Sequence, residues 1–303
     1  VKDGYEAYVF FVIQMKDVRY FTPNRQTHPE FAEALAEAER NGVKILAYDC
    51  SVTEDSIELG KEVPVVLEYP QLYEMREPLV QWYRENKRDL PWRENPEAYR
   101  VWISEIMLQQ TRVEAVKGYY DRFLKTLPDV QSLAEAEEDQ LLKLWEGLGY
   151  YNRVRNMQKA ARQIMVDYHG IRSLPGIGSY TAGAISSFAF GKPEPAVDGN
   201  VLRVLTRILA DHSDIMKQST KTKMEKALRK VIPEGSPSDF NQGLIELGAI
   251  VCVPNGEPKC QECPVSHLCR AREEGRISEF PVKKKAKARR IEDKTILVFR
   301  DDE

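Results

Sequence analysis

The feature that most restricts the fold of this chain is a group of four closely spaced cysteines. They follow the pattern C-x7-C-x2-C-x5-C and comprise Cys252, Cys260, Cys263 and Cys269. Four thiols this close together, in a chain without a secretion signal, favour a metal site over disulfides. Zinc can be held by four thiolates, and so can a 4Fe–4S cluster. The spacing therefore predicts a metal centre and leaves these two identities open.

The composition is that of a soluble globular protein. Of the 303 residues, 42% are hydrophobic and 30% are charged, and this length suits two domains or one large domain with appendages. No apolar run approaches the roughly 18–20 residues of a membrane-spanning helix. The short apolar run 8–13 lacks a cleavage signature, so no signal peptide is predicted and the cytoplasm is the expected compartment.

Charge and periodicity divide the chain into three parts. Residues 1–69 contain 7 basic and 13 acidic residues, a net charge of −6, and combine strand-like runs with one helical stretch. They predict a small α/β fragment. Residues 70–280 are almost wholly helical, with frequent turn signals. Residues 281–303 contain the basic run KKKAKARR, which suits a solvated linker or weak attraction to phosphate, and a final strand-like run.

One turn between helical stretches has an unusual composition. In LPGIGSYTAGA (174–184), Gly176 and Gly178 precede a helix made mostly of small residues. Glycines allow backbone amides to approach a phosphate closely, with the N-terminus of the next helix behind them. The ordinary alternative is a plain corner between two helices.

Two acidic residues lie where their surroundings should separate their pKa values. Glu105 lies in an apolar helical stripe, where burial raises the pKa of a carboxyl group. Asp198 lies at the predicted start of an amphipathic helix, which favours its ionised form. Such a pair suits glycosidic bond cleavage, because one acid protonates the leaving group and the other supports a cationic sugar. A surface acid and a simple helix N-cap are the ordinary explanations of the same residues.

Several motifs follow one another in the helical part. In chain order they are LPWR (90–93), WISEIMLQQT (102–111), WEGLGYYNRVRN (145–156), the glycine turn, VDGNVLRV (197–204) and the cysteine loop 252–269. Together they resemble the helix–hairpin–helix (HhH-GPD) DNA glycosylases with an iron–sulfur cluster, most closely the adenine-removing MutY type, over about 72–282. The resemblance implies a mainly α fold behind the α/β fragment, with a 4Fe–4S cluster on the cysteines. It also implies removal of adenine mispaired with 8-oxoguanine or guanine.

The same resemblance assigns roles to individual residues. Glu105 would protonate an adenine ring nitrogen, and Asp198 would support the oxocarbenium-like sugar electrostatically or as a transient covalent partner. Asn200 would orient Asp198, and Tyr180 would position both carboxylates. The implied DNA-contacting residues are Trp92 and Arg93 beside the flipped adenine, Gln110 and Tyr150 as wedges in the duplex, and Gln109, Gly176, Gly178 and Thr181. The expected partner is mismatched double-stranded DNA, bound by a nucleoid-associated monomer without membrane contact.

Tyr180 separates two branches of this superfamily. Endonuclease III-type relatives place a lysine at this position, and that lysine forms a Schiff base and cuts the strand. A phenol cannot do so. The sequence therefore favours a monofunctional hydrolase, with an endonuclease III-like glycosylase/lyase as an alternative.

The motifs GYEAYVFFVIQM, RYFTPN, HPEFAEAL and GVKILAYDC in residues 1–69 resemble a different family. They are similar to the C-terminal segment of the sugar fermentation stimulation protein A family. That family's nuclease-like acidic and lysine motif would lie upstream of Val1, so no activity is expected from this fragment.

The helical part departs from the glycosylase pattern in three places. The step from DYHG (167–170) to IRSLPG (171–176) is shorter than usual, which reduces the first hairpin helix to about 171–174. The first cysteine loop is one residue longer than usual, which a turn can absorb. The final run resembles the first strand of a truncated Nudix-like domain, so a reduced preference for the oxidised base is expected. The shortened hairpin makes a catalytically impaired iron–sulfur DNA-binding protein the second alternative.

Overall fold

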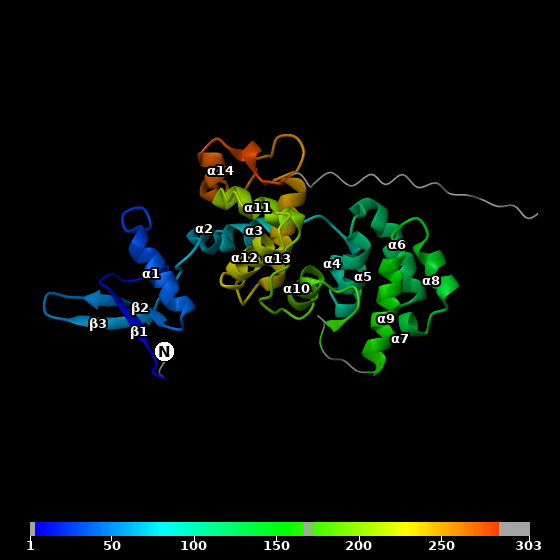
Figure 1. Cartoon of the computed structure of the whole chain (residues 1–303), viewed down its shortest axis with the longest axis horizontal. Helices are drawn as coiled ribbons and strands as arrows, with labels where there is room; N and C mark the ends of the chain where they lie inside the picture. The colour runs from blue at the N-terminus through cyan, green and yellow to red at the C-terminus, as the bar shows by residue number, and fades with distance from the viewer. Residues whose placement is uncertain (1–3, 167–169, 171–172, 285–303) are drawn as a thin grey trace, which may run out of the picture.

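The computed structural model describes residues 4–166, 170 and 173–284, and it consists of a small α/β unit followed by a larger helical part (Figure 1). This arrangement confirms the predicted mainly α fold with an α/β fragment at its start. The predicted strand 295–300 and most of the basic linker lie outside the described residues. So do residues 167–169 and 171–172, which contain most of the shortened step before the glycine turn.

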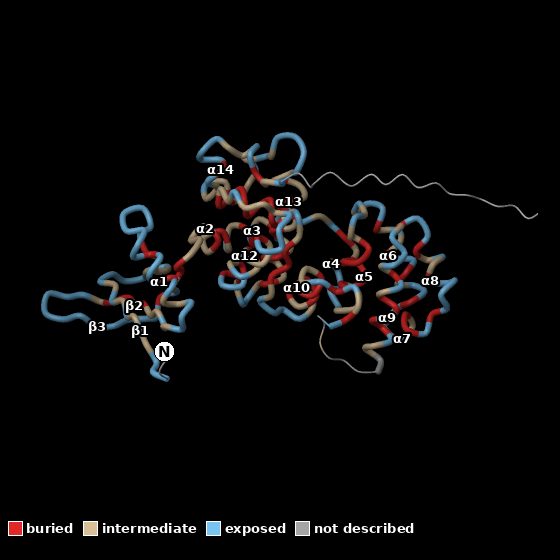
Figure 2. Tube along the Cα trace, viewed as in Figure 1, coloured by how far each residue is buried: buried red, intermediate tan, exposed pale blue. Residues whose placement is uncertain are grey.

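The α/β unit is a three-stranded sheet with one helix. Strand β1 (Tyr8–Ile13) pairs in parallel with β2 (Lys44–Val52), which pairs in antiparallel fashion with β3 (Ile57–Glu62). Helix α1 (Pro29–Arg40) connects the two parallel strands and packs against β2. Alternate residues of β1 are exposed, and every residue of β3 is exposed, as the pale tube of β3 in Figure 2 shows. The hydrophobic core of this unit is therefore thin.

The first lobe of the helical part contains the helices from residue 91 to the glycine turn, together with the helix after that turn. It comprises α4 (Pro91–Glu94), α5 (Ala98–Leu108), α6 (Val113–Thr126), α7 (Val130–Glu135), α8 (Glu138–Trp145), α9 (Asn152–Val166) and α10 (Ser179–Phe188). Large side chains such as Phe123 and Trp145 are completely buried in its core, where their rings meet edge to face. Each helix buries an apolar stripe, and together the stripes form one continuous core.

The second lobe combines segments from both ends of the helical part. It comprises α2 (Pro70–Glu74), α3 (Arg76–Asn86), α11 (Gly199–Leu209), α12 (Gln218–Arg229), α13 (Pro237–Ile250), the short helix α14 (Arg270–Glu273), and 3-10 turns at Ser266–Leu268 and Ile277–Glu279. Its core is separate from that of the first lobe and contains Leu72, Phe240 and Leu244. Helix α3, early in the sequence, packs along the much later α13. The chain therefore leaves the second lobe after α3, builds the first lobe, and returns.

Helix α10 lies at the junction of the two lobes. It packs on α5 in the first lobe and on α13 in the second. Its small residues allow this close approach: a Cβ atom added at Gly183 would lie 2.0 Å from the carbonyl oxygen of Pro195. Because α10 begins directly after the glycine turn, that turn also lies at the junction of the lobes.

Candidate active site

Glu105 is a carboxylic acid inside the hydrophobic interior of the first lobe. Every residue from Val101 to Met107 is buried, and Glu105 is only 6% exposed. Burial raises its pKa to about 7, and the charge of Asp198 adds to this effect. A hydrogen bond from Tyr180 and the charge of Arg93 oppose the rise. The predicted rise in the pKa of Glu105 is confirmed.

Asp198 is the N-cap residue of α11, in the second lobe. Its Oδ1 atom accepts a 2.8 Å hydrogen bond from the backbone N–H of Val201, and its Oδ2 atom accepts one of 2.8 Å from the side-chain amide of Asn200. The predicted effect on its pKa was wrong. Burial raises the pKa of Asp198 and outweighs the opposing effect of these hydrogen bonds and of Arg203. The hydrogen bonds at the helix N-terminus therefore orient this carboxylate and lower its pKa, but burial has the larger effect.

Tyr180 lies between the two acids. It occupies the first turn of α10, which begins after the N-cap residue Gly178. Its hydroxyl is hydrogen-bonded to the Glu105 carboxyl. Burial, followed by the charges of Glu105 and Asp198, raises the pKa of Tyr180 well above its usual value. The phenol is therefore neutral at physiological pH and available as a hydrogen-bond donor.

A buried acid that the sequence interpretation missed lies beside this group. Glu246, on α13, is completely buried and accepts hydrogen bonds from Arg88 (2.8 Å) and Arg93 (2.8 Å). Burial opposes its ionisation, but the hydrogen bonds from Arg88 and Arg93 lower its pKa to about 2. Arg93 also donates to the Gln242 side chain at 3.1 Å. Glu246, like Glu105, is an acid within an apolar helical stretch, so the same sequence pattern could have identified it.

Several of these side chains line one cavity at the junction of the lobes. Its lining includes Trp92, Arg93, Glu105, Tyr180 and Gln242, so both residues predicted to border a flipped base are present. Among the described residues that line it there is no lysine. The cavity therefore offers an acid of raised pKa, a phenol and a guanidinium, but no amine for a Schiff base.

The remaining predicted contact residues differ in their exposure. Gly176 and Gly178 are exposed on the turn before α10, and Gly176 has a φ of +79°. The amides of this turn are therefore accessible from solvent. Thr181 is only 2% exposed and points into the interior, which argues against the direct DNA contact predicted for it. Gln109 is partly buried at the end of α5.

Gln110 and Tyr150 share two properties although 40 residues separate them in the sequence. Both are exposed, Tyr150 by 65%. Both have the left-handed backbone conformation, with φ of +58° for Gln110 and +47° for Tyr150. Side chains other than glycine rarely adopt this conformation, and it is common at functional sites.

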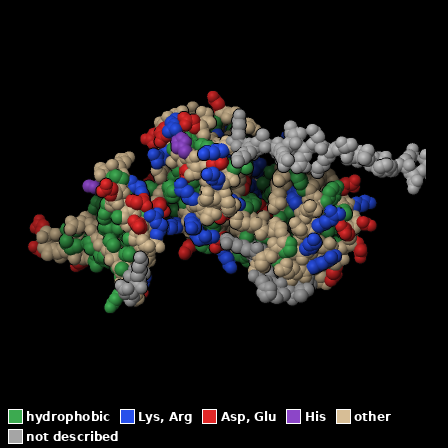
Figure 3. All heavy atoms as spheres, viewed as in Figure 1, with side chains coloured by type: hydrophobic (Ala, Val, Ile, Leu, Met, Phe, Trp, Pro, Cys, Tyr) green, Lys and Arg blue, Asp and Glu red, His purple; other side chains and the backbone are tan. Residues whose placement is uncertain are grey.

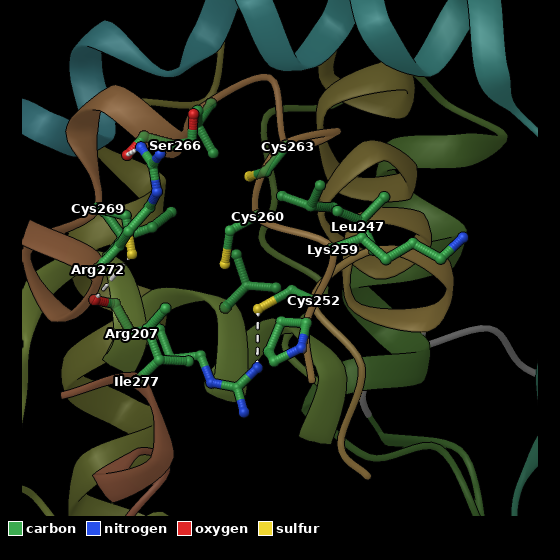
Figure 4. Close-up of a pocket in the computed structure, with 15 residues that line it drawn as sticks. Arg207, Leu247, Cys252, Lys259, Cys260, Cys263, Ser266, Cys269, Arg272 and Ile277 are labelled. Carbon is green, nitrogen blue, oxygen red and sulfur yellow. Dashed lines mark hydrogen bonds between the residues drawn. The ribbon is translucent and has the colours of Figure 1, made fainter. Parts of the chain in front are cut away.

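The four predicted metal ligands line a second cavity, in the second lobe. The thiols of Cys252, Cys260, Cys263 and Cys269 face a common space (Figure 4). Within the described part of the chain, no three His, Cys, Asp or Glu side chains converge closely enough to hold a metal ion. Four thiols around one cavity suit a metal centre held by cysteines, either zinc or an iron–sulfur cluster. Burial raises the pKa values of Cys260, Cys263 and Cys269.

Two arginines of α11 join the cysteine loop to the rest of the lobe. Arg207 donates to the Cys252 sulfur at 3.2 Å (Figure 4). Arg203 donates to the backbone carbonyl of Cys252 and to the side-chain oxygen of Asn200, both at 2.8 Å. Since Asn200 itself donates to Asp198, an unbroken chain of hydrogen bonds connects the cysteine loop with the acid at the cavity.

The surface of the helical part carries many cations. Figure 3 shows Lys and Arg side chains spread over this part on the face that is visible. Outside residues 1–69, the sequence has 37 basic and 34 acidic residues. None of the described helices combines the length and apolar composition needed to cross a membrane.

Comparison with family models matches both parts of the chain. Residues 103–234 match the HhH-GPD superfamily base excision DNA repair proteins, and residues 1–56 match the sugar fermentation stimulation protein RE domain. Both resemblances inferred from the sequence are therefore confirmed.

Curated relatives and solved structures agree with the first match. The adenine DNA glycosylase of Rattus norvegicus is 42% identical over 226 residues, covering 68% of this chain and 44% of the relative. That of Homo sapiens is 43% identical over 212 residues, covering 64% and 39%. The chain thus spans less than half the length of these two relatives.

Two solved structures share the fold of the helical part. A thermostable thymine-DNA glycosylase matches with a TM-score of 0.60 and 29% identity, over 68% of this chain and 98% of that chain. A non-covalent endonuclease III–DNA complex matches with a TM-score of 0.57 and 25% identity, over 68% and 97%.

Proposed function

We propose that this chain, whose helical part belongs to the HhH-GPD superfamily of base excision DNA repair proteins, is a monofunctional DNA glycosylase that removes adenine mispaired with 8-oxoguanine or guanine. The observation that carries this proposal is a cavity lined by Glu105 and Tyr180, with Asp198 close enough for its charge to act on both. Relatives named adenine DNA glycosylase support the choice of base.

Glu105 is the proton donor in this proposal. Its raised pKa keeps a proton on the carboxyl near neutral pH, and a ring nitrogen of the extruded adenine accepts that proton. Protonation makes the base a better leaving group, so the N-glycosidic bond breaks and its electron pair departs with adenine. Tyr180 holds the Glu105 carboxyl by its hydrogen bond.

Asp198 stabilises the sugar in this proposal. Loss of the base leaves positive charge on the sugar, and Asp198, at the start of α11, is close enough for its charge to act on Glu105 and Tyr180. Asn200 fixes its orientation through the 2.8 Å hydrogen bond to Oδ2. The oxygen of a water molecule then bonds to the anomeric carbon, and a carboxylate of the pair accepts the released proton.

We further propose that the four cysteines hold a 4Fe–4S cluster. When bound, the cluster would close the loop 252–269. Arg203 and Arg207 connect that loop to α11, the helix whose N-cap residue is Asp198. The two arginines would thereby link the cluster loop to the segment that carries Asp198.

The test is adenine release from a duplex with one adenine opposite 8-oxoguanine, next to duplexes with guanine or thymine opposite. Wild-type protein should release adenine from the first two and much less from the third. Absence of release from all three would contradict the glycosylase proposal. DNA binding without release would favour the catalytically impaired alternative.

Borohydride trapping distinguishes the lyase alternative. An enzyme that forms a Schiff base with DNA is trapped as a covalent adduct. Because Tyr180 offers no amine and no lysine is among the described residues that line the cavity, no more than a trace of adduct is expected. Efficient trapping would favour an endonuclease III-like activity.

A further inference from the structure

Two exposed loops of the first lobe lie beside each other, although they are far apart in the sequence. One follows α5 and contains Gln110, and the other follows α8 and contains Tyr150. Each presents one exposed side chain in the left-handed conformation at its tip. A backbone in this conformation is maintained only when its surroundings hold it.

Arg153, in the first turn of α9, holds both loops through its guanidinium group. Toward the first loop, Nη1 donates to the carbonyl oxygens of Ile106 (3.0 Å) and Gln109. Toward the second loop, Nη2 donates to the carbonyl oxygens of Leu148 (2.9 Å) and Gly149 (3.2 Å). One side chain therefore joins the two loops by hydrogen bonds to their backbones.

Further contacts fix the guanidinium itself. Its plane lies near the rings of Trp145 and Tyr150, with its central carbon 5.3 Å and 5.5 Å from their centres. Both terminal nitrogens also reach the Thr111 hydroxyl, at 3.5 Å and 3.4 Å. The side chain is half-buried beneath the loops, so it is poorly placed to act as a surface phosphate contact.

The chemistry of this contact suits arginine and not lysine. A guanidinium has five N–H donors in a rigid plane, so it can bond carbonyls on two sides at once. A lysine ammonium carries the same charge on one nitrogen and cannot span the two loops in the same way. If charge alone mattered, lysine would serve equally well.

We propose that Arg153 is a positioning residue that sets the exposed side chains of Gln110 and Tyr150 as a paired wedge for extruding a base from the duplex. The inference rests on the proposed glycosylase function. Extrusion of a base costs unstacking energy, and inserted side chains recover part of it only if they stand ready in the correct place. Without Arg153 the two tips are no longer held together, and the base is extruded less often.

The experiment measures base extrusion separately from chemistry. A duplex carries 2-aminopurine in place of the mispaired adenine, and its fluorescence rises when the base leaves the stack. Wild type should raise this fluorescence on binding. Arg153→Ala should lose most of the rise and release adenine at least about tenfold more slowly, with duplex affinity and melting temperature changed far less.

Two further variants define the interpretation. Arg153→Lys keeps the charge and should remain defective in extrusion, and it carries the test if Arg153→Ala does not fold. Arg162→Ala is the matched control, because Arg162 lies on the same helix and donates to a backbone carbonyl, that of Ala134, at 2.9 Å. It should extrude the base as wild type does.

The outcomes separate this proposal from the proposed function. Normal extrusion by Arg153→Ala, full rescue by lysine, or an equal loss in Arg162→Ala would overturn the wedge-positioning role. A wild-type protein that binds the duplex without raising the fluorescence would overturn it as well. A wild type that extrudes the base but releases no adenine would contradict the glycosylase proposal and leave the role of Arg153 supported.

Discussion

The two lobes of the helical part supply their acids in different ways. The first lobe places Glu105 in the middle of α5, where buried residues surround it and one tyrosine hydroxyl contacts it. The second lobe places Asp198 at the end of α11, where a backbone N–H and the Asn200 amide hold both of its oxygens. Burial raises the pKa of both acids. The two acids therefore differ in the number of hydrogen-bond donors that contact them, which is larger at Asp198.

This difference indicates how the lobes divide the proposed reaction. An acid with few donors gives up its proton to a substrate with little rearrangement. A carboxylate with both oxygens held is better preorganised to face a positive charge. The following predictions examine this division, beginning with the largest expected effect.

Glu105→Gln should cause the largest loss. Glutamine fills the same space but cannot protonate the base, so single-turnover adenine release should fall by about a thousandfold. Glu97→Gln, at the exposed start of the same helix, is the matched control and should retain the wild-type rate. A similar rate in Glu105→Gln and wild type would remove Glu105 from the chemistry.

Asp198→Asn should cause a smaller loss, of about a hundredfold, because it removes only the charge that supports the sugar. Asparagine is itself a good N-cap, so the melting temperature should change little. Asp129→Asn, at the N-cap of α7 in the first lobe, controls for the helix effect and should not alter the rate. A large drop in melting temperature for Asp198→Asn would show that its role is mainly structural.

The third prediction concerns stability and pH. The pKa of Glu105 rises from 4.5 to about 7 on folding, so the folded state binds this proton more tightly than the unfolded chain. Wild type should therefore lose stability relative to Glu105→Gln as pH rises from about 4.5 to about 7, by on the order of 3 kcal/mol, with little further change above. Thermal melts of both proteins across this range measure the difference.

The same titration should affect activity. Only protonated Glu105 can donate, so adenine release by wild type should decline above about pH 7. A melting-temperature difference that is constant from pH 4 to 8 would contradict the raised pKa. A wild-type melting temperature that falls relative to that of Glu105→Gln toward acid pH would contradict its sign.

The smallest effect is expected where the second lobe meets the α/β unit. Lys230, the C-cap residue of α12, pairs with Glu39 on α1 at 2.6 Å, but the two side chains are 55% and 38% exposed. Exposed pairs contribute little, so Lys230→Ala should lower stability by about 0.5 kcal/mol or less. Lys226→Ala, one turn earlier, is the control for loss of a charge on α12. A much larger effect of Lys230→Ala would mean that the two units stabilise one another strongly.

Some features of the site could be predicted from local sequence patterns. The apolar stripe around Glu105 indicated burial and hence a raised pKa, and the polar start of an apolar helix indicated that Asp198 begins α11. Periodicity likewise predicted the helical part and the three-stranded unit before it. These features depend on residues a few positions apart, so the sequence displays them directly.

Other features depend on residues that are distant in the sequence. Burial at the cavity comes from both lobes, and for this reason the pKa of Asp198 is raised and not lowered. The pairing of Arg93 with Glu246 joins residues 153 positions apart. Arg153 lies within the motif 145–156, which resembles the glycosylase family, but its contacts with two loops are evident only in the folded structure.

The sequence by itself determined that Glu105 lies within an apolar helix and that Asp198 lies at the start of another. It also determined the four cysteines, the glycine turn and the tyrosine in place of a lysine. Each is a matter of residue type and short spacing, which local chemistry decides. Only the tertiary structure decided that the charge of Asp198 acts on Glu105, that Asp198 is partly buried, that the thiols surround one cavity, and that one arginine joins two loops. These features arise because the second lobe, which the first lobe interrupts in the sequence, packs on α10. No short stretch of sequence shows this packing, because it joins residues that are far apart in the chain.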